Sequence, residues 1–120
     1  MNYVFLIGRL TKDPDLRITK NGKSTARMTL AVDRDYKNKN GERETDFIPI
    51  VTWGNLAETC AMYLEKGKKI CVIGKMEVRS YVDKEIKKYI TEVIARDVRF
   101  LEKVQKKPIE SLAEKLRTPF

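Results

Sequence analysis

The chain contains no histidine, and this absence removes several classes of catalytic site at once. Ser-His-Asp and Cys-His catalysis both need an imidazole that titrates near neutral pH, and His-containing zinc sites need it as a ligand. The sequence therefore predicts a binding protein rather than an enzyme, with no catalytic residues, no metal and no cofactor.

Cysteines and long apolar runs are also scarce. The two cysteines, Cys60 and Cys71, lie eleven positions apart, which gives neither a four-ligand zinc set nor a secreted disulfide scaffold. We expect both to be reduced and buried. No apolar run approaches the ~20 residues of a membrane span, and residues 1–4 do not resemble a signal peptide. We therefore expect a cytoplasmic protein with no membrane partner.

Positive charge, in contrast, is abundant. The 120 residues carry 25 Lys and Arg against 17 Asp and Glu, a formal net charge of +8, so a polyanion is the first partner to consider. A hydrophobic content of 42 % is enough for a packed core, and the length suits one compact domain. We expect a single, folded, basic domain.

Most of the chain has the pattern of strands. Residues 26–33 alternate apolar and polar side chains, and Pro49 indicates an edge position or a bulge in a later strand. Two Asn-Gly pairs, at 21–22 and 40–41, favour hairpins, the first with a type I′ turn. The expected strands are Tyr3–Leu10, Leu16–Lys20, residues 26–33, Phe47–Trp53, Ile70–Tyr81 and Tyr89–Leu101, with a long loop over 36–44 and a charged loop over 82–88.

A single helix is expected between the strands that end at Trp53 and begin at Ile70. Asn55 and Glu58 have the spacing of a capping box, and Leu56, Cys60 and Leu64 recur every four residues. One helix provides too few crossovers for a parallel sheet, and strands of this length must close or stack to hide their edges. The order therefore predicts an all-β fold, the five-stranded Greek-key barrel called the OB-fold, with its one α-helix between strands 3 and 4. Such barrels commonly bind oligonucleotides or oligosaccharides.

Four aromatic residues lie at the ends of loops or on one face of a strand, where side chains need not belong to the core. Tyr36 opens the long loop and Tyr81 begins the charged one. Phe47 and Trp53 lie six positions apart, so they share one strand face, where they would flank Pro49 and Val51. Unpaired bases stack on exposed rings at roughly 1–3 kcal/mol each, whereas a duplex offers no such faces. Three other aromatics are expected in the core: Phe5, Tyr63 and Phe100.

Basic side chains alternate with these aromatics. Each one alone is as consistent with a solvated surface charge as with a phosphate contact, but together with the aromatics they favour nucleic-acid binding. The candidates on strands or at strand ends are Arg9, Lys12, Arg27, Arg34, Lys75 and Arg79.

Several separated blocks resemble the bacterial single-stranded DNA-binding proteins in order and spacing, over about residues 1–101. The blocks are Val4-Phe-Leu-Ile-Gly-Arg-Leu-Thr-Lys-Asp-Pro-Asp-Leu-Arg17, Asn21-Gly22, Thr29-Leu-Ala-Val32, Asp46-Phe-Ile-Pro-Ile-Val-Thr-Trp-Gly54, Leu56-Ala-Glu58, Tyr63-Leu-Glu-Lys-Gly67 and Thr91-Glu-Val93. The resemblance implies an OB-fold homotetramer that wraps and protects single-stranded DNA in replication, recombination and repair. It also implies that the family's stacking aromatics fall on Tyr36, Phe47, Trp53 and Tyr81, with Arg79 at a basic position.

The chain departs from that family after residue 101. Members typically continue through a long linker to an acidic tip that ends in Pro-Phe and recruits other DNA-processing proteins. Here residues 102–120 form a short tail with five basic and three acidic residues, a net charge of +2, that ends in Pro119 and Phe120. A short helix is expected through Ile109, Leu112 and Leu116. The tail gives little support to recruitment of replication or repair proteins, and it suggests a shortened, phage- or mobile-element-borne version that would act in the host cytoplasm.

Two alternative functions remain open at this stage. A primosome-type accessory protein of the same fold would act mainly through protein contacts, although the full aromatic set argues against it. Single-stranded RNA is the other alternative, because stacking platforms accept either sugar and only a 2′-hydroxyl contact discriminates.

Overall fold

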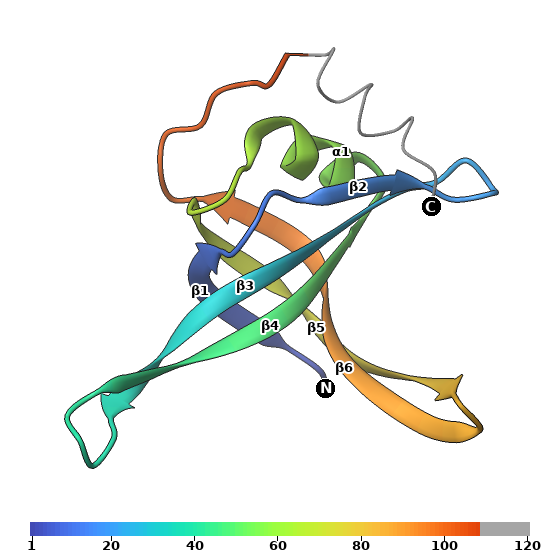
Figure 1. Ribbon diagram of the computed structural model, residues 1–120. Coiled ribbons are helices and arrows are strands. Elements are labelled where there is room, and N and C mark those ends of the chain that lie inside the picture. The colour runs from blue at the N-terminus through green and yellow to red at the C-terminus, as the bar shows by residue number, and fades with distance from the viewer. Residues whose placement is uncertain (109–120) are drawn as a thin grey trace.

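The computed structural model describes residues 1–108 and shows a strand-rich barrel with one helix (Figure 1). The short β2 pairs only with β3, so the barrel is built from the other five strands. The elements are β1 (Val4–Leu10), β2 (Asp15–Ile18), β3 (Ser24–Lys37), β4 (Arg43–Trp53), α1 (Gly54–Tyr63), β5 (Lys69–Asp83) and β6 (Ile86–Phe100).

The strands close through pairings at both ends of the sheet order. Their order is β1-β5-β6-β4-β3-β2, and β1 also pairs with β3. All pairings are antiparallel except β4 with β6, which is parallel at Ile50 and Val51. The five-stranded barrel is therefore confirmed, and α1 lies between its third and fourth strands, β4 and β5.

The barrel core is filled by the apolar positions that alternate along the strands. Met28 and Leu30 of β3 are buried together with Ile50 of β4, and Cys60 and Leu64 pack against them from the helix region. This burial confirms the helical face predicted from the four-residue spacing. Both cysteines are free and buried, and burial raises the pKa of the Cys60 thiol to about 12.

Two long hairpins extend away from the barrel in different directions, β3–β4 and β5–β6 (Figure 1). The β5–β6 ladder continues to the pair Asp83 and Ile86, so the loop predicted over 82–88 is wrong. Only Lys84 and Glu85 form the turn, and both have positive φ, 50° and 68°. The charged side chains point into solvent while the backbone groups remain paired, which a reading of side-chain polarity alone misses.

The first Asn-Gly hairpin also differs from its predicted form. A type I′ turn needs positive φ at both central residues, but Gly22 has φ 81° and Asn21 is not in that region. The N–H of Thr19 donates to the carbonyl of Lys23, which leaves a three-residue loop. The glycine is therefore the left-handed last residue of that loop, and the type I′ prediction is wrong.

The helix begins differently from the predicted capping box. It starts at Gly54, with Trp53 at the N-cap position and no side-chain cap hydrogen bond. The carboxylate of Glu58 instead accepts a hydrogen bond from Ser24 Oγ of β3 at 3.1 Å. Tertiary contact with the neighbouring strand has therefore replaced the local cap, and the capping-box prediction is wrong.

The first part of the tail lies against the barrel. Glu102 Oε1 accepts from the N–H of Lys69 at 2.8 Å and from Arg9 Nη1 at 3.1 Å. Val104 packs against the core.

Within residues 1–108 no helix is long and apolar enough to cross a membrane. The helix predicted near residues 109–116 lies outside the described residues.

Candidate nucleic-acid interface

The outward side of β4 carries two exposed aromatic rings, as the strand period predicts. Phe47 is 66 % exposed and Trp53 is 45 % exposed. Val51 lies between them on the same side but is only 2 % exposed, because β6 pairs with β4 there and places Ile94 opposite it. The expectation of an open surface over Val51 is therefore wrong. Pro49 is half-buried and lies just outside this short parallel pairing.

A buried carboxylate joins the outward sides of three strands. Glu92 of β6 is only 5 % exposed. Its Oε1 accepts from Arg79 Nε at 2.9 Å, and its Oε2 accepts from Arg27 Nη1 at 3.1 Å. Both guanidinium groups stay about half exposed, and each keeps further N–H donors for a ligand. One acid therefore holds two cations side by side at the surface.

These arginines share a face with the aromatic rings. Arg27 lies directly opposite Val51 in the β3–β4 ladder, so its side chain is on the Phe47 and Trp53 side. Tyr81 lies two residues after Arg79 in β5, and its side chain is 44 % exposed. We call the surface formed by these five residues the stacking face: Arg27, Phe47, Trp53, Arg79 and Tyr81.

The structure does not bring Tyr36 and Arg34 to the stacking face. Together they line a separate depression that also includes Phe5 and Asp46. Arg34 donates to both carboxylate oxygens of Asp46 at 3.1 Å and to Glu44 at 2.6 Å. The hydrogen bond from Arg34 lowers the pKa of Asp46 below its usual range. This arginine is therefore engaged within the β3–β4 hairpin.

The remaining basic candidates occupy different surroundings. Arg9 pairs with Glu102 at 3.1 Å, at the far end of β1. Lys75 pairs with Glu77 at 3.0 Å along β5. Lys12 lines a hollow of about 240 Å³ together with the β3 arginine of the stacking face. Lys12 is thus the basic candidate that lies beside this face.

The three aromatic residues predicted for the core have different outcomes. Phe5 is 65 % exposed, so its prediction is wrong, because β1 turns it outward. Tyr63 and Phe100 are half-buried, with ring centroids 6.2 Å apart, and Phe100 packs against the core.

Sequence reasoning missed two features of this surface. It did not identify Glu92 as the acid that organises the stacking face. It also overlooked an outward row formed by Phe5 and Ile7 of β1, which are 65 % and 47 % exposed, and by Tyr3 just before this strand, which is 68 % exposed. The period of two in β1 is a sequence signal that could have found the row.

The comparisons with known proteins agree with this geometry. The matching family model, described as the single-strand binding protein family, covers residues 1–101. Single-stranded DNA-binding protein 2 of Clostridium acetobutylicum is 53 % identical over 104 residues, which is 85 % of this chain and 77 % of that protein. Single-stranded DNA-binding protein B of Bacillus subtilis is 46 % identical over 114 residues, 94 % of this chain and 98 % of that protein.

A solved structure gives the same result for the fold. The Plasmodium falciparum SSB in complex with ssDNA superposes with a TM-score of 0.76 at 30 % identity, over 85 % of this chain and 96 % of that one. The proteins of the matching family bind DNA without catalysis, which confirms the expectation of a non-enzymatic protein. The chain belongs to the single-strand binding protein family.

Proposed function

We propose that this protein binds single-stranded DNA with little regard to sequence. The observation that carries the proposal is the stacking face, where Phe47, Trp53 and Tyr81 are exposed beside two half-exposed arginines. Unpaired bases stack on such rings at roughly 1–3 kcal/mol each. Every base has a π face, so this binding tolerates any sequence, whereas a duplex keeps its bases inside. The names of the relatives and of the solved complex support the same ligand.

Phosphate binding is proposed for the cations that keep free donors. Arg27 and Arg79 share Glu92 and still expose about half of each side chain, and Lys12 lies beside Arg27. Each of the basic candidates Arg9, Arg34 and Lys75 is paired with a carboxylate. We assign to these three a contribution through the field of the protein rather than through direct contact.

Tyr36 is proposed as a fourth stacking residue at a distance from the others. Its ring is 66 % exposed and lies near the end of β3, in the hairpin that extends away from the barrel. A strand of DNA that contacts both Tyr36 and the stacking face must follow the curved surface of the protein. This placement supports wrapping of the DNA rather than a straight path across one groove.

The proposal extends to assembly and cellular role. The exposed side chains of Phe5 and Ile7 on β1 form an apolar surface, and we propose that further copies of the chain cover it in a homotetramer. We propose that residues 1–101 form the DNA-binding domain, with 102–120 as a short basic tail. The protein would then protect single strands in replication, recombination and repair in the cytoplasm.

Titration of the tryptophan fluorescence tests DNA binding. Trp53 is the only tryptophan, and its indole is 45 % exposed on the stacking face. Oligo-dT should quench its emission, and log K should fall as log salt rises with a slope of about −0.7 per phosphate contacted. Unchanged emission together with undetectable binding at low salt would refute the proposal. Competition with matched rU oligomers reports whether RNA binds equally well.

A molar-mass measurement tests the assembly. Light scattering of the protein alone, and with a long dT oligomer, gives the number of chains and the stoichiometry together. Four chains per particle are expected. A monomer both with and without DNA would contradict the tetramer while leaving the DNA-binding proposal to the fluorescence titration.

A further inference from the structure

Trp53 lines two hollows that otherwise share no residue. The first has a volume of about 460 Å³ and lies between Trp53 and the N-terminal residues Asn2 and Tyr3. The second, about 490 Å³, lies toward the β2–β3 turn and includes Lys23 and Glu58. Both volumes are in the range of small-ligand sites. A DNA strand that stacks on Trp53 therefore has two routes away from this ring.

The chemistry of the linings distinguishes the two hollows. The first is lined by Ile94, Ala95 and Gly74, with Lys75 and Arg96 as its charged residues, so it is apolar and positively charged. The second contains a carboxylate, Glu58, in addition to its lysine. A nucleotide combines an apolar base face with a negative phosphate. The first hollow has the complementary composition.

The backbone of β6 places Arg96 at this hollow. In the β5–β6 ladder Ile73 pairs with Asp97 while Gly74 pairs with Ala95, so Arg96 is an extra residue in a β-bulge. The two strands approach closely there, since a Cβ on Gly74 would lie 2.1 Å from the carbonyl oxygen of Ile94. Bulges of this kind redirect a side chain, and the lack of a side chain at Gly74 allows the backbones of β5 and β6 to approach closely beneath it.

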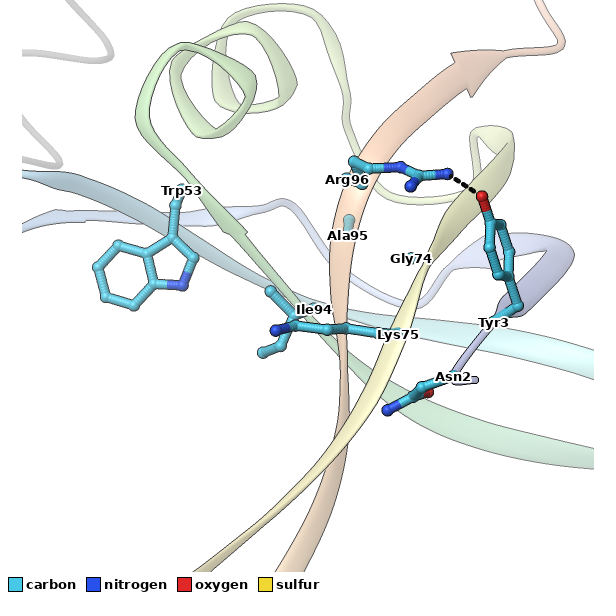
Figure 2. Close-up of a pocket in the computed structure, with 8 residues that line it drawn as sticks. All are labelled: Asn2, Tyr3, Trp53, Gly74, Lys75, Ile94, Ala95 and Arg96. Atoms are coloured by element: carbon cyan, nitrogen blue, oxygen red, sulfur yellow. Dashed lines mark hydrogen bonds between the residues drawn. The ribbon is translucent and has the colours of Figure 1, made fainter.

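The side chain of Arg96 is fixed by an aromatic ring. Its Nη2 donates to the hydroxyl of Tyr3 at 2.8 Å, and its guanidinium carbon lies 5.1 Å from the centre of the same ring. Figure 2 shows this pair on one side of the hollow and Trp53 on the other, with Ile94 and Lys75 between them. The guanidinium is therefore held at the rim opposite the indole.

Arg96 differs from six other arginines because its hydrogen-bond partner is not a carboxylate, although the neighbouring carboxylate of Asp97 interacts with its charge. Its hydrogen-bond partner is a neutral phenol, and the adjacent carboxylate of Asp97 accepts from Arg99 Nε at 2.8 Å. In contrast, a carboxylate pairs with each of six other arginines: Arg9, Arg17, Arg27, Arg34, Arg79 and Arg99. An ordered cation with a neutral partner favours an anionic ligand.

We propose that single-stranded DNA leaves Trp53 through the first hollow, where one base lies over Ile94, Ala95 and Gly74 and its phosphate contacts Arg96. This inference rests on the proposed function, because it extends the path of the same strand. It adds a nucleotide subsite beyond the stacking face and makes Tyr3 a positioning residue for the phosphate-binding guanidinium.

The test compares two substitutions that each remove one positive charge, one from each of the two hollows that Trp53 lines. Arg96→Gln alters the first hollow and Lys23→Gln the second. Binding of fluorescently labelled oligo-dT is measured by anisotropy at several salt concentrations. Arg96→Gln should weaken binding roughly tenfold and make the slope of log K against log salt less negative by about 0.7. Lys23→Gln should change both values little.

Two further measurements keep the result interpretable. Thermal unfolding establishes that each variant is folded, and Arg96→Lys, which keeps the charge, should retain the salt slope while losing part of the affinity. Light scattering records the molar mass of each variant. Equal affinities of Arg96→Gln and wild type would overturn the subsite, as would an effect confined to Lys23→Gln. A changed molar mass with unchanged DNA affinity would also overturn it, in favour of a contact between chains.

Failure of this inference is distinguishable from failure of the proposed function. If the wild-type protein does not bind oligo-dT at low salt, the proposed function itself fails. If the wild type binds with Trp53 quenching and Arg96→Gln binds equally well, only the subsite is wrong.

Discussion

Arg79 reaches Glu92 diagonally across the β5–β6 ladder, with 2.9 Å between Arg79 Nε and Glu92 Oε1. The residue directly opposite Glu92 is another acid, Glu77, whose carboxylate pairs with Lys75 at 3.0 Å. Two like charges at a directly opposed pair repel each other. Here each acid has its own basic partner, which offsets this repulsion, and Glu92 also accepts a hydrogen bond from Arg27.

The first prediction concerns this shared carboxylate. Glu92→Gln removes a charge that is 95 % shielded from solvent and leaves two arginines without their acid. The free energy of unfolding should fall by about 1–3 kcal/mol, a range that allows for the half-exposed arginine partners. Urea denaturation measures it. Affinity for oligo-dT should stay the same or rise, because the stacking face gains positive charge.

Glu77→Gln is the matched control for Glu92→Gln. It removes one negative charge from the position directly opposite in the ladder, but this carboxylate is exposed and holds one exposed lysine. Its effect on the free energy of unfolding should stay within about 0.5 kcal/mol. Equal effects of the two substitutions would show that the buried bridge does not stabilise the fold.

The second prediction distinguishes base stacking on the rings of the stacking face from nonspecific DNA binding by any exposed aromatic ring. Phe47→Ala should weaken binding of oligo-dT by roughly 1–3 kcal/mol. Its ring is 66 % exposed, so the unfolding temperature should change little. The control is Tyr89→Ala, since Tyr89 is equally exposed at 66 % but lies opposite Ser80, on the other side of the hairpin from Tyr81. Anisotropy titrations of both variants should show a loss for Phe47→Ala alone, and comparable losses would argue against a defined stacking face.

The paired aromatic residues of β4 were predictable because the strand period acts within one segment. Phe47 and Trp53 need only the alternation of a single strand to lie on one side. Glu92 was not predictable in the same way, since its burial depends on Arg27, which is 65 positions away in sequence, and on the convergence of three strands. The burial of Val51 likewise depends on a parallel contact with β6 that no local pattern encodes.

The turns show the same division between local and tertiary information. The Asn-Gly pair at 21–22 correctly predicted a hairpin. The pairing of β2 with β3, however, leaves a three-residue loop, and this length determines the type of turn. At the tip of β5–β6, in contrast, the ladder enforces a two-residue turn although the sequence offers Lys84 and Glu85, neither of which favours positive φ. The sheet therefore determines the backbone where local preference is unfavourable.

The third prediction follows from this strained turn. Replacing Lys84 and Glu85 together by Asn and Gly leaves the net charge unchanged and supplies residues that tolerate φ values of 50° and 68°. The free energy of unfolding should rise by about 1 kcal/mol. The same dipeptide placed at Lys20 and Asn21 is the control, because there the positive φ belongs to Gly22. A gain at the control site but not at 84–85 in urea denaturation would contradict the assignment of strain.

The fourth prediction concerns the pH dependence of the tail contact. The N–H of Lys69, and to a smaller degree Arg9, lowers the pKa of Glu102 below its ordinary value of 4.5. In the unfolded chain this carboxylate takes up its proton at a higher pH than in the folded protein. Its contribution to stability is therefore present above pH 4.5 and is lost as the pH falls below that value.

Glu102→Gln should accordingly lower the free energy of unfolding at pH 7, and its difference from the wild type should shrink as the pH is lowered below 4.5. Urea denaturation of both proteins over this range measures the difference, and a difference that stays constant with pH would rule out the carboxylate as its source. Affinity for oligo-dT provides an independent check. Glu102 contacts β1 and the start of β5 rather than the stacking face, so its substitution should leave the fluorescence titration of Trp53 unchanged. A large loss of DNA affinity would instead place this segment on the DNA path.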